Sequence, residues 1–193
     1  MIEAKKMEYN KLKFLSERQL AEHNILYNGY VNKINEIRTK MQNADLNTAN
    51  ATLSDLRSLK IAETFALNGI KLHEGYFKAI GKPIEPSGKI LEMINKNFGS
   101  YGKFNDEFKA TALAVRGWVV LAYDLDYKEL KIFGSDAHDN GAVWGCMPLL
   151  ILDVYEHAYF MDYGSSRKKY VENFMENIDW DSINNDIKGL LEK

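Results

Sequence analysis

The sequence has one cysteine and four histidines among its 193 residues. A lone cysteine excludes an intrachain disulfide and any zinc or iron–sulfur site that is built from several thiolates. Cys146 opens an apolar run, where a small buried hydrophobic side chain is the simpler role. Because histidines are so few, a metal site that is rich in nitrogen ligands has few candidate residues.

Neither positive nor negative charge is in large excess, because the sequence has 25 Lys and Arg residues and 27 Asp and Glu residues. Binding of nucleic acid needs a clustered basic surface, and the longest basic run, residues 167–169, is too short for a duplex. No stretch approaches the roughly 20 apolar residues of a membrane span. Residues 1–14 mix charges and lack the apolar segment of a secretory signal. We therefore expect a cytoplasmic protein that has neither nucleic acid nor a membrane as a partner.

The N-terminal part of the chain favours helix. Ser16 and Gln19 have the spacing of a capping box, in which two side chains satisfy each other's backbone N–H groups at a helix start. Apolar and aromatic residues then recur in steps of three and four. The residues that share this helix face are Leu20, His23, Tyr27, Tyr30 and Ile34.

A second helix is expected after a polar turn at residues 43–50. It begins near Thr52 or Ser54 and runs to about Ile80. The residues on its inner face are Leu59, Ala66, Ile70, His73, Phe77 and Ile80. Two long helices joined in this way form an antiparallel hairpin.

Residues 81–88 contain Pro83 and Pro86 and break the helical pattern, so they mark a domain boundary. We expect a helical hairpin domain over residues 1–82 and an α+β domain over residues 87–193. Strands are expected over residues 117–123, in a segment that ends at residue 133, and over residues 143–152. Helices are expected over residues 89–97, 105–115, 156–162, 166–177 and 182–192. The fold class is therefore α+β, with a small three-stranded antiparallel sheet flanked by helices.

Four side chains are candidates for one metal site. Asp153 and His157 are four residues apart where the third strand ends, so both can face one ion. His23 and His73 lie on the inner faces of the paired helices; each alone could equally be a core histidine bonded to a carbonyl. Together the four residues offer three nitrogens and one carboxylate, a set that suits iron, manganese or zinc. Such a site would lie between the two expected domains.

Residues 153–159 resemble the signature of the iron/manganese superoxide dismutases, aspartate-x-tryptophan-glutamate-histidine-alanine-tyrosine, with Tyr155 in place of the tryptophan. The likeness continues in residues 177–181. Residues 72–77 are similar to the family's asparagine-histidine-x-x-phenylalanine-tryptophan segment, and residues 30–35 are similar to its tyrosine-valine-x-x-leucine-asparagine segment. The resemblance covers nearly the whole chain.

The resemblance implies a homodimeric enzyme with one iron or manganese ion per subunit, held by His23, His73, Asp153 and His157. Superoxide would be its substrate, converted to oxygen and hydrogen peroxide in a ping-pong cycle of the metal. Tyr30 would be the tyrosine at the mouth of the site. Arg167 would lie in the substrate funnel, the alternative being a surface basic cluster. The aromatic residues expected to wall the site are Trp118, Trp144, Tyr76, Phe77 and Tyr155.

The first helix departs from the family pattern. The family's ligand histidine lies eight residues before the tyrosine, whereas His23 lies seven before Tyr30 and Glu22 holds the eighth position. Helical geometry favours His23, because a residue one position away points about 100° elsewhere. Glu22 is the competing ligand.

Two further departures concern the surroundings of the metal. The family's outer-sphere glutamine is missing: the second helix has Gly69, and His138 in the loop before the third strand is the natural substitute unless it is merely an exposed loop residue. The polar pair that normally bridges the dimer is replaced by Leu26 and Phe160, while Glu156 could still orient His157 across a dimer. These changes motivate an alternative, a non-enzymatic metal-binding or structural member of the same fold. A second alternative, suggested by the helical hairpin, is a ferritin-like di-iron protein; the absence of a glutamate-x-x-histidine pair from both helices argues against it.

Overall fold

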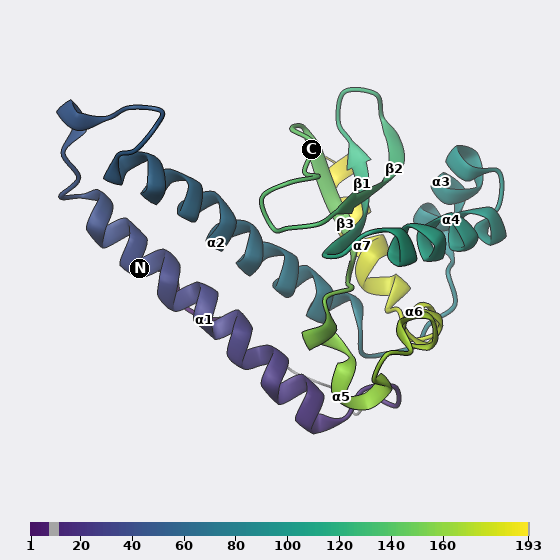
Figure 1. Cartoon of the computed structure of the whole chain (residues 1–193). Coiled ribbons are helices and arrows are strands. Elements are labelled where there is room, and N and C mark those ends of the chain that lie inside the picture. Colours follow the sequence, from purple (N-terminus) through teal and green to yellow (C-terminus); the bar gives the residue numbers. More distant parts are fainter. Residues whose placement is uncertain (8–11, 193) are drawn as a thin grey trace.

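A computed structural model describes residues 1–7 and 12–192 of the chain. Two long helices, α1 (Glu17–Met41) and α2 (Asp55–Ala79), are joined by a connector that contains the short 3₁₀ helix η1 (Leu46–Thr48). They lie side by side and extend away from the rest of the molecule (Figure 1). The expected helical hairpin is thus confirmed.

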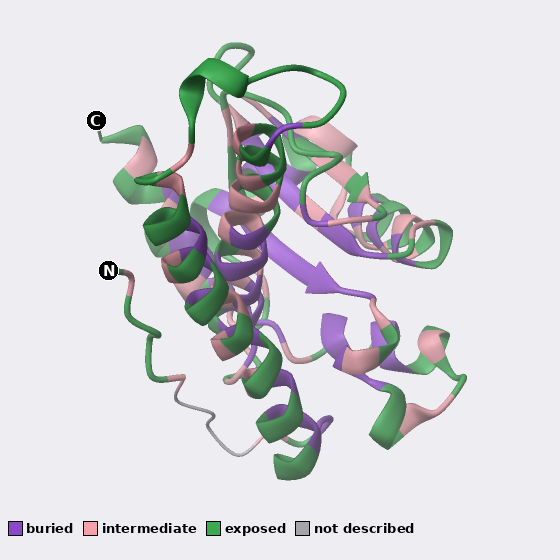
Figure 2. Ribbon diagram, turned by 60° about the vertical axis from the view of Figure 1, so that its left-hand side comes forward, coloured by how far each residue is buried: buried purple, intermediate pink, exposed green. Residues whose placement is uncertain are grey.

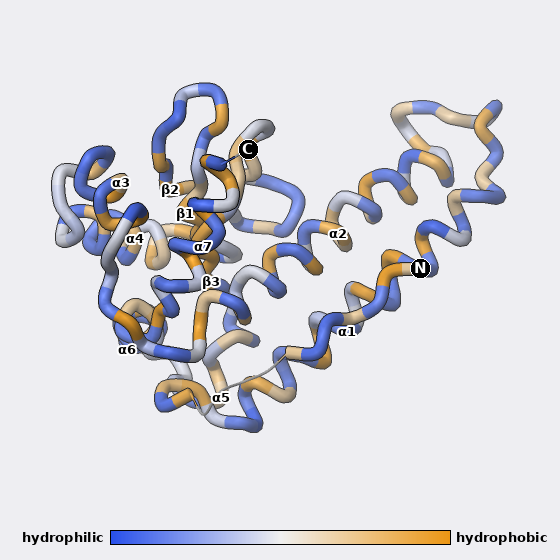
Figure 3. The backbone as a smooth tube through the Cα atoms, turned by 180° about the vertical axis from the view of Figure 1, so that it is seen from behind, coloured by the Kyte–Doolittle hydropathy of each residue, from blue (hydrophilic) through white to orange (hydrophobic). Residues whose placement is uncertain are grey.

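The hairpin is held together by the helix faces that the sequence spacing predicts. Along both helices hydrophilic and hydrophobic residues alternate around the axis (Figure 3), and the buried residues gather on the faces that meet (Figure 2). His23 and His73 are both fully buried among these residues. Tyr30 is only half-buried, and Glu22 is exposed on another face of α1. Burial therefore separates His23 from the competing Glu22.

The first helix begins at the predicted residue, but its capping box is only half formed. The Ser16 hydroxyl accepts from the Gln19 backbone N–H at 3.1 Å. The Ser16 backbone N–H donates instead to the Asp162 carboxylate at 2.6 Å. Because a carboxylate is a stronger acceptor than an amide oxygen, Asp162 takes the place that the Gln19 side chain would have in a capping box. The Gln19 side chain is therefore free to point elsewhere.

The rest of the chain forms a small sheet with helices around it. The strands β1 (Trp118–Asp124), β2 (Glu129–Ser135) and β3 (Cys146–Asp153) form an antiparallel sheet in the order β2-β1-β3. The helical elements of this part are α3 (Gly88–Phe98), α4 (Tyr101–Ala114), η2 (Glu156–Ala158), α5 (Phe160–Tyr163), α6 (Arg167–Met175) and α7 (Trp180–Leu191). The α+β fold class and the three-stranded sheet are confirmed, whereas the division into domains at residues 82 and 87 stays a prediction.

Strand β3 is the element that brings the sheet to the helices. It is an edge strand, which explains how Pro148, with no N–H to donate, is accommodated. It begins at Cys146 rather than at residue 143, because Gly145 has a φ of +83° and the chain is still turning there. Cys146, expected to be buried, is half-buried. The strand packs against α2 and ends at Asp153, opposite Trp118 of β1.

No helix of the described part of the chain is both long and apolar enough to cross a bilayer.

Candidate metal site

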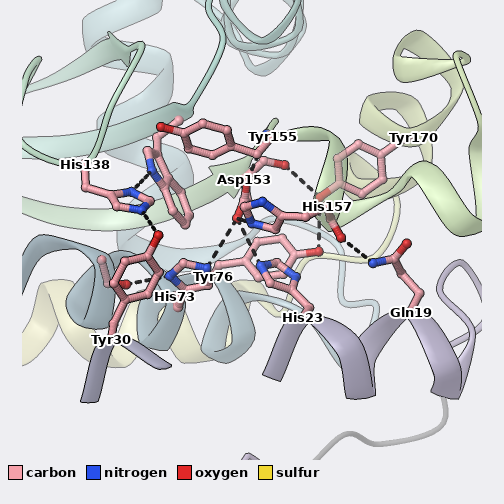
Figure 4. Close-up of polar contacts among 12 residues, drawn as sticks. Gln19, His23, Tyr30, His73, Tyr76, His138, Asp153, Tyr155, His157 and Tyr170 are labelled. Carbon is pink, nitrogen blue, oxygen red and sulfur yellow. Dashed lines mark hydrogen bonds and ion pairs between the residues drawn. The ribbon is translucent and has the colours of Figure 1, made fainter. Parts of the chain in front are cut away.

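Four side chains from four elements converge at the end of β3. His23 comes from α1, His73 from α2, Asp153 from the last position of β3 and His157 from η2, and one potential ligand atom of each lies within 4.8 Å of the others (Figure 4). All four were singled out in the sequence. The structure brings them together, and it does so with residues from both parts of the chain.

The three imidazoles surround one carboxylate oxygen. Asp153 Oδ2 lies 3.0 Å from His23 Nε2, 3.2 Å from His157 Nε2 and 3.7 Å from His73 Nε2. Asp153 Oδ1 accepts from the Tyr155 backbone N–H at 2.9 Å, which fixes the plane of the carboxylate. The arrangement presents three nitrogens and one oxygen to a common point.

Protonation in this buried cluster suits cation binding. Burial lowers the pKa of His23, and it lowers the pKa of His73 to about 3. Burial alone would raise the pKa of Asp153, but the neighbouring His157 and His23 outweigh it and leave that pKa below its usual value. At neutral pH His23 and His73 are therefore neutral with a free lone pair, and the aspartate is charged.

The hydrogen bonds of His73 show whether the four side chains suit a metal ion. Its Nδ1 lies 2.6 Å from the Gly69 carbonyl oxygen, which can only accept, so Nδ1 carries the proton and Nε2 bears the lone pair. Within the described residues, this buried Nε2 has no hydrogen-bond partner. An unpaired buried acceptor next to a buried carboxylate is costly. A cation bound among the four atoms removes that cost, and a set of three imidazoles and one carboxylate fits iron or manganese.

A hydrogen-bonded chain of three residues borders the cluster. The Trp118 Nε1–H donates to His138 Nδ1 at 2.8 Å, so the other nitrogen of His138, Nε2, carries the proton and donates to the Tyr30 hydroxyl at 2.6 Å. His138 is buried, not an exposed loop residue. Both of its ring nitrogens are engaged, so it contacts the site through Tyr30.

Gly69 makes room for this chain. A Cβ added at Gly69 would lie 3.0 Å from atoms of the Tyr30 ring. The Tyr30 ring thus occupies the space beside Gly69 into which a larger side chain would project. The expectation that His138 substitutes for the family's glutamine stays a prediction.

Aromatic rings wall the cluster, as expected for Trp118, Tyr155, Tyr76 and Phe77. The Tyr76 and Phe77 ring centroids lie 5.1 and 4.9 Å from that of His23. The Tyr155 ring stacks on His157 with centroids 5.3 Å apart, and the edge of Trp118 meets His73 at 5.0 Å. Burial raises the pKa of Tyr155 to about 12, and its hydroxyl donates to the Asp136 carbonyl. The expectation for Trp144 was wrong, because its side chain is 98% exposed. Trp144 follows a glycine-rich turn that carries it away from the core.

Two other predicted residues lie outside the cluster. Arg167 donates to the Val115 carbonyl at 2.9 Å and to the Tyr159 hydroxyl at 3.1 Å. Together with Lys109 it lines an open surface cavity, and its place in a substrate funnel stays a prediction. Glu156 is exposed beside His157, and its role across a dimer stays a prediction.

Sequence reasoning missed the role of two residues that support the cluster, Tyr170 and Gln19. The Tyr170 hydroxyl lies 2.9 Å from the Asp153 carbonyl and 3.0 Å from the Tyr76 hydroxyl, and all three residues are fully buried. Gln19 contacts the backbone of His157. Gln19 was interpreted only as a capping residue.

Comparison with known proteins agrees with this arrangement. A family model for the C-terminal domain of iron/manganese superoxide dismutases matches residues 86–186. An iron superoxide dismutase of Aquifex aeolicus is 40% identical over 179 residues, which is 90% of this chain and 84% of that protein. A manganese superoxide dismutase of Haloferax volcanii is 36% identical over 179 residues, 90% of this chain and 88% of that protein.

These matches, together with the α+β fold and the buried cluster of three histidines and one aspartate, define a metal-binding oxidoreductase. The chain belongs to the iron/manganese superoxide dismutase family.

Proposed function

We propose that this chain is a superoxide dismutase that binds one iron or manganese ion per subunit through His23, His73, Asp153 and His157. The observation that carries the proposal is the convergence of three imidazole Nε2 atoms on one buried carboxylate oxygen. Relatives named for iron and for manganese both match the chain over most of its length.

When bound, the metal would supply the one-electron chemistry: one superoxide is oxidised to oxygen, and a second is reduced with two protons to hydrogen peroxide. The residues around it manage protons and water. Tyr30 accepts a hydrogen bond from His138, so its own hydroxyl proton is directed away from His138. Burial raises the pKa of Tyr30, which keeps this proton in place at neutral pH. Tyr30 is therefore our candidate for the group that donates a hydrogen bond to substrate.

His138 and Trp118 hold that donor in position. Trp118 has only a donor to offer and fixes the tautomer of His138, and His138 in turn orients Tyr30. Trp118 and Tyr155 cover His73 and His157, and so reduce the access of bulk water to the cluster.

We further propose that the chain forms a homodimer. Ile25 and Leu26 of α1 and Phe160 and Met161 of α5 are large apolar side chains between 40% and 61% exposed. They flank η2, against which α1 packs, and η2 carries both His157 and the exposed Glu156. A second copy on this surface would cover the apolar side chains and bring its Glu156 near the site. Residence in the cytoplasm stays a prediction from the sequence, and cell fractionation would test it.

Metal analysis of the purified protein, with superoxide-consumption assays on iron- and manganese-reconstituted samples, tests the proposed activity. We expect about one metal per chain, and His157→Ala should lose both metal and activity. Full metal occupancy without activity for either metal would contradict the enzyme and support the non-enzymatic alternative.

A further inference from the structure

Gln19 occupies an unusual place between the first helix and the loop that carries His157. It lies one helical turn before His23, and its side chain is completely buried. Its Nε2–H donates to the His157 backbone carbonyl at 2.6 Å, and its Oε1 accepts from the Met161 backbone N–H at 3.1 Å. Figure 4 shows the first of these contacts at the edge of the cluster. Both ends of one amide therefore tie α1 to this loop.

The loop needs such a tie more than the other elements of the cluster do. His23 and His73 sit inside 25-residue helices, and Asp153 ends a strand that is paired with β1. His157 lies in a 3₁₀ helix of three residues, and its side chain is 29% exposed whereas the other three are fully buried. It is thus the member of the cluster that its own element holds least firmly.

We propose that Gln19 is a positioning residue that sets the place of His157 relative to His23, and thereby the affinity of the site for its metal. The inference rests on the metal site proposed above. Gln19 is on the same helix as His23, so its two hydrogen bonds fix the distance between α1 and the backbone of His157. Groups that orient metal ligands typically change metal affinity 10- to 100-fold when they are removed.

The chemistry of the two contacts defines the informative variants. Gln19→Met keeps the volume and the apolar stem but removes both the donor and the acceptor. Gln19→Glu keeps the acceptor for Met161 but replaces the donor with an oxygen that faces the His157 carbonyl. Both variants should loosen His157, and the second one does so with almost no change of shape.

A matched control is available nearby. The Tyr163 hydroxyl donates to the Phe14 carbonyl at 2.6 Å and so links α5 to the segment just before α1. The same hydroxyl accepts from the Asn173 side chain at 2.9 Å, so Tyr163→Phe removes two hydrogen bonds, as Gln19→Met does, without removing any contact of the four cluster residues. A general loosening of this region would appear in both variants, whereas misplacement of His157 would appear only at Gln19.

The experiment is an equilibrium competition for manganese(II) against a chelator, with thermal unfolding of the metal-free and metal-loaded protein. We expect Gln19→Met and Gln19→Glu to raise the metal Kd about 10-fold or more, and Tyr163→Phe to leave it within about twofold. If Gln19→Met does not fold, the Gln19→Glu result decides. Wild-type binding with an unchanged Kd in the Gln19 variants would overturn this inference alone. Failure of the wild type to bind iron or manganese would overturn the proposed function itself.

Discussion

Single residues decide which group can act at this site. Glu22 and His23 are neighbours in the sequence, yet only His23 points to Asp153, because one step along a helix rotates a side chain by about 100°. The ligand candidates could therefore be predicted from spacing. The contact of His138 with Tyr30 could not, because it joins residues 108 positions apart through a loop that has no periodicity.

The close approach of Tyr30 to Gly69 yields a test at this scale. Gly69→Ala places a methyl group 3.0 Å from the Tyr30 ring, so the ring must shift and weaken its bond to His138. We expect a loss of about 1–3 kcal/mol in the free energy of unfolding, as for overpacked cores, together with reduced superoxide consumption.

Gly29 on α1 is the control for this substitution, because nothing lies within 4 Å of a Cβ added there. Gly29→Ala should be stabilising by up to about 1 kcal/mol from helix propensity, with unchanged activity. Denaturant unfolding and activity assays measure both variants. Equal behaviour of the two would contradict the packing argument.

The buried histidines predict how the stability of the metal-free protein changes with pH. Burial lowers the pKa of His73 to about 3 in the folded protein, against 6.5 for a histidine exposed to water. Between these values the unfolded chain binds the additional proton, so the metal-free protein loses stability as pH falls below 6.5, by up to about 1.4 kcal/mol per pH unit for this group. Urea unfolding of metal-free protein between pH 7 and 4.5 measures the slope. His73→Gln should flatten it, and an identical slope in that variant would contradict the assignment.

At the scale of elements, periodicity predicted the two long helices well, whereas α4 begins at Tyr101 rather than at residue 105 and β3 begins at Cys146 rather than at residue 143. The caps at Ser16 and Ser54 and the buried faces of α1 and α2 follow from local chemistry. The start of β3 depends on the positive φ of Gly145 and on a register shift opposite Leu121 and Ala122, which a pattern of apolar residues does not encode. Gln19 illustrates the same limit. Its side chain does not complete the capping box, because the Ser16 backbone N–H donates to Asp162, a residue 146 positions further along the chain.

The segment after β3 also differs from its prediction. One helix was expected over residues 156–162, but the chain forms η2, breaks, and continues as α5. Asp153 and His157 face one point, and a regular helix begins only after that turn, at Phe160. This irregular stretch is where Gln19 and Tyr170 supply the support that regular secondary structure provides elsewhere.

At the scale of the whole molecule, the cluster joins the helical hairpin to the sheet, and the proposed dimer surface lies beside it. Leu26→Glu places a charge among the apolar side chains of that surface, and we expect the molar mass from light scattering to fall from that of a dimer to that of a monomer. Ile61→Glu on α2 is the control, since Ile61 is 45% exposed and Leu26 is 40% exposed. Monomeric wild-type protein, or dissociation by both variants, would contradict the proposed surface.

The most direct test of the account is a crystal structure of the metal-loaded protein with anomalous diffraction at the iron and manganese absorption edges. We predict one anomalous peak per chain at bonding distance from the Nε2 atoms of His23, His73 and His157 and from Asp153 Oδ2. A peak that is bound by Glu22 in place of His23, or no peak among these four residues in protein with measured metal, would contradict the proposed site.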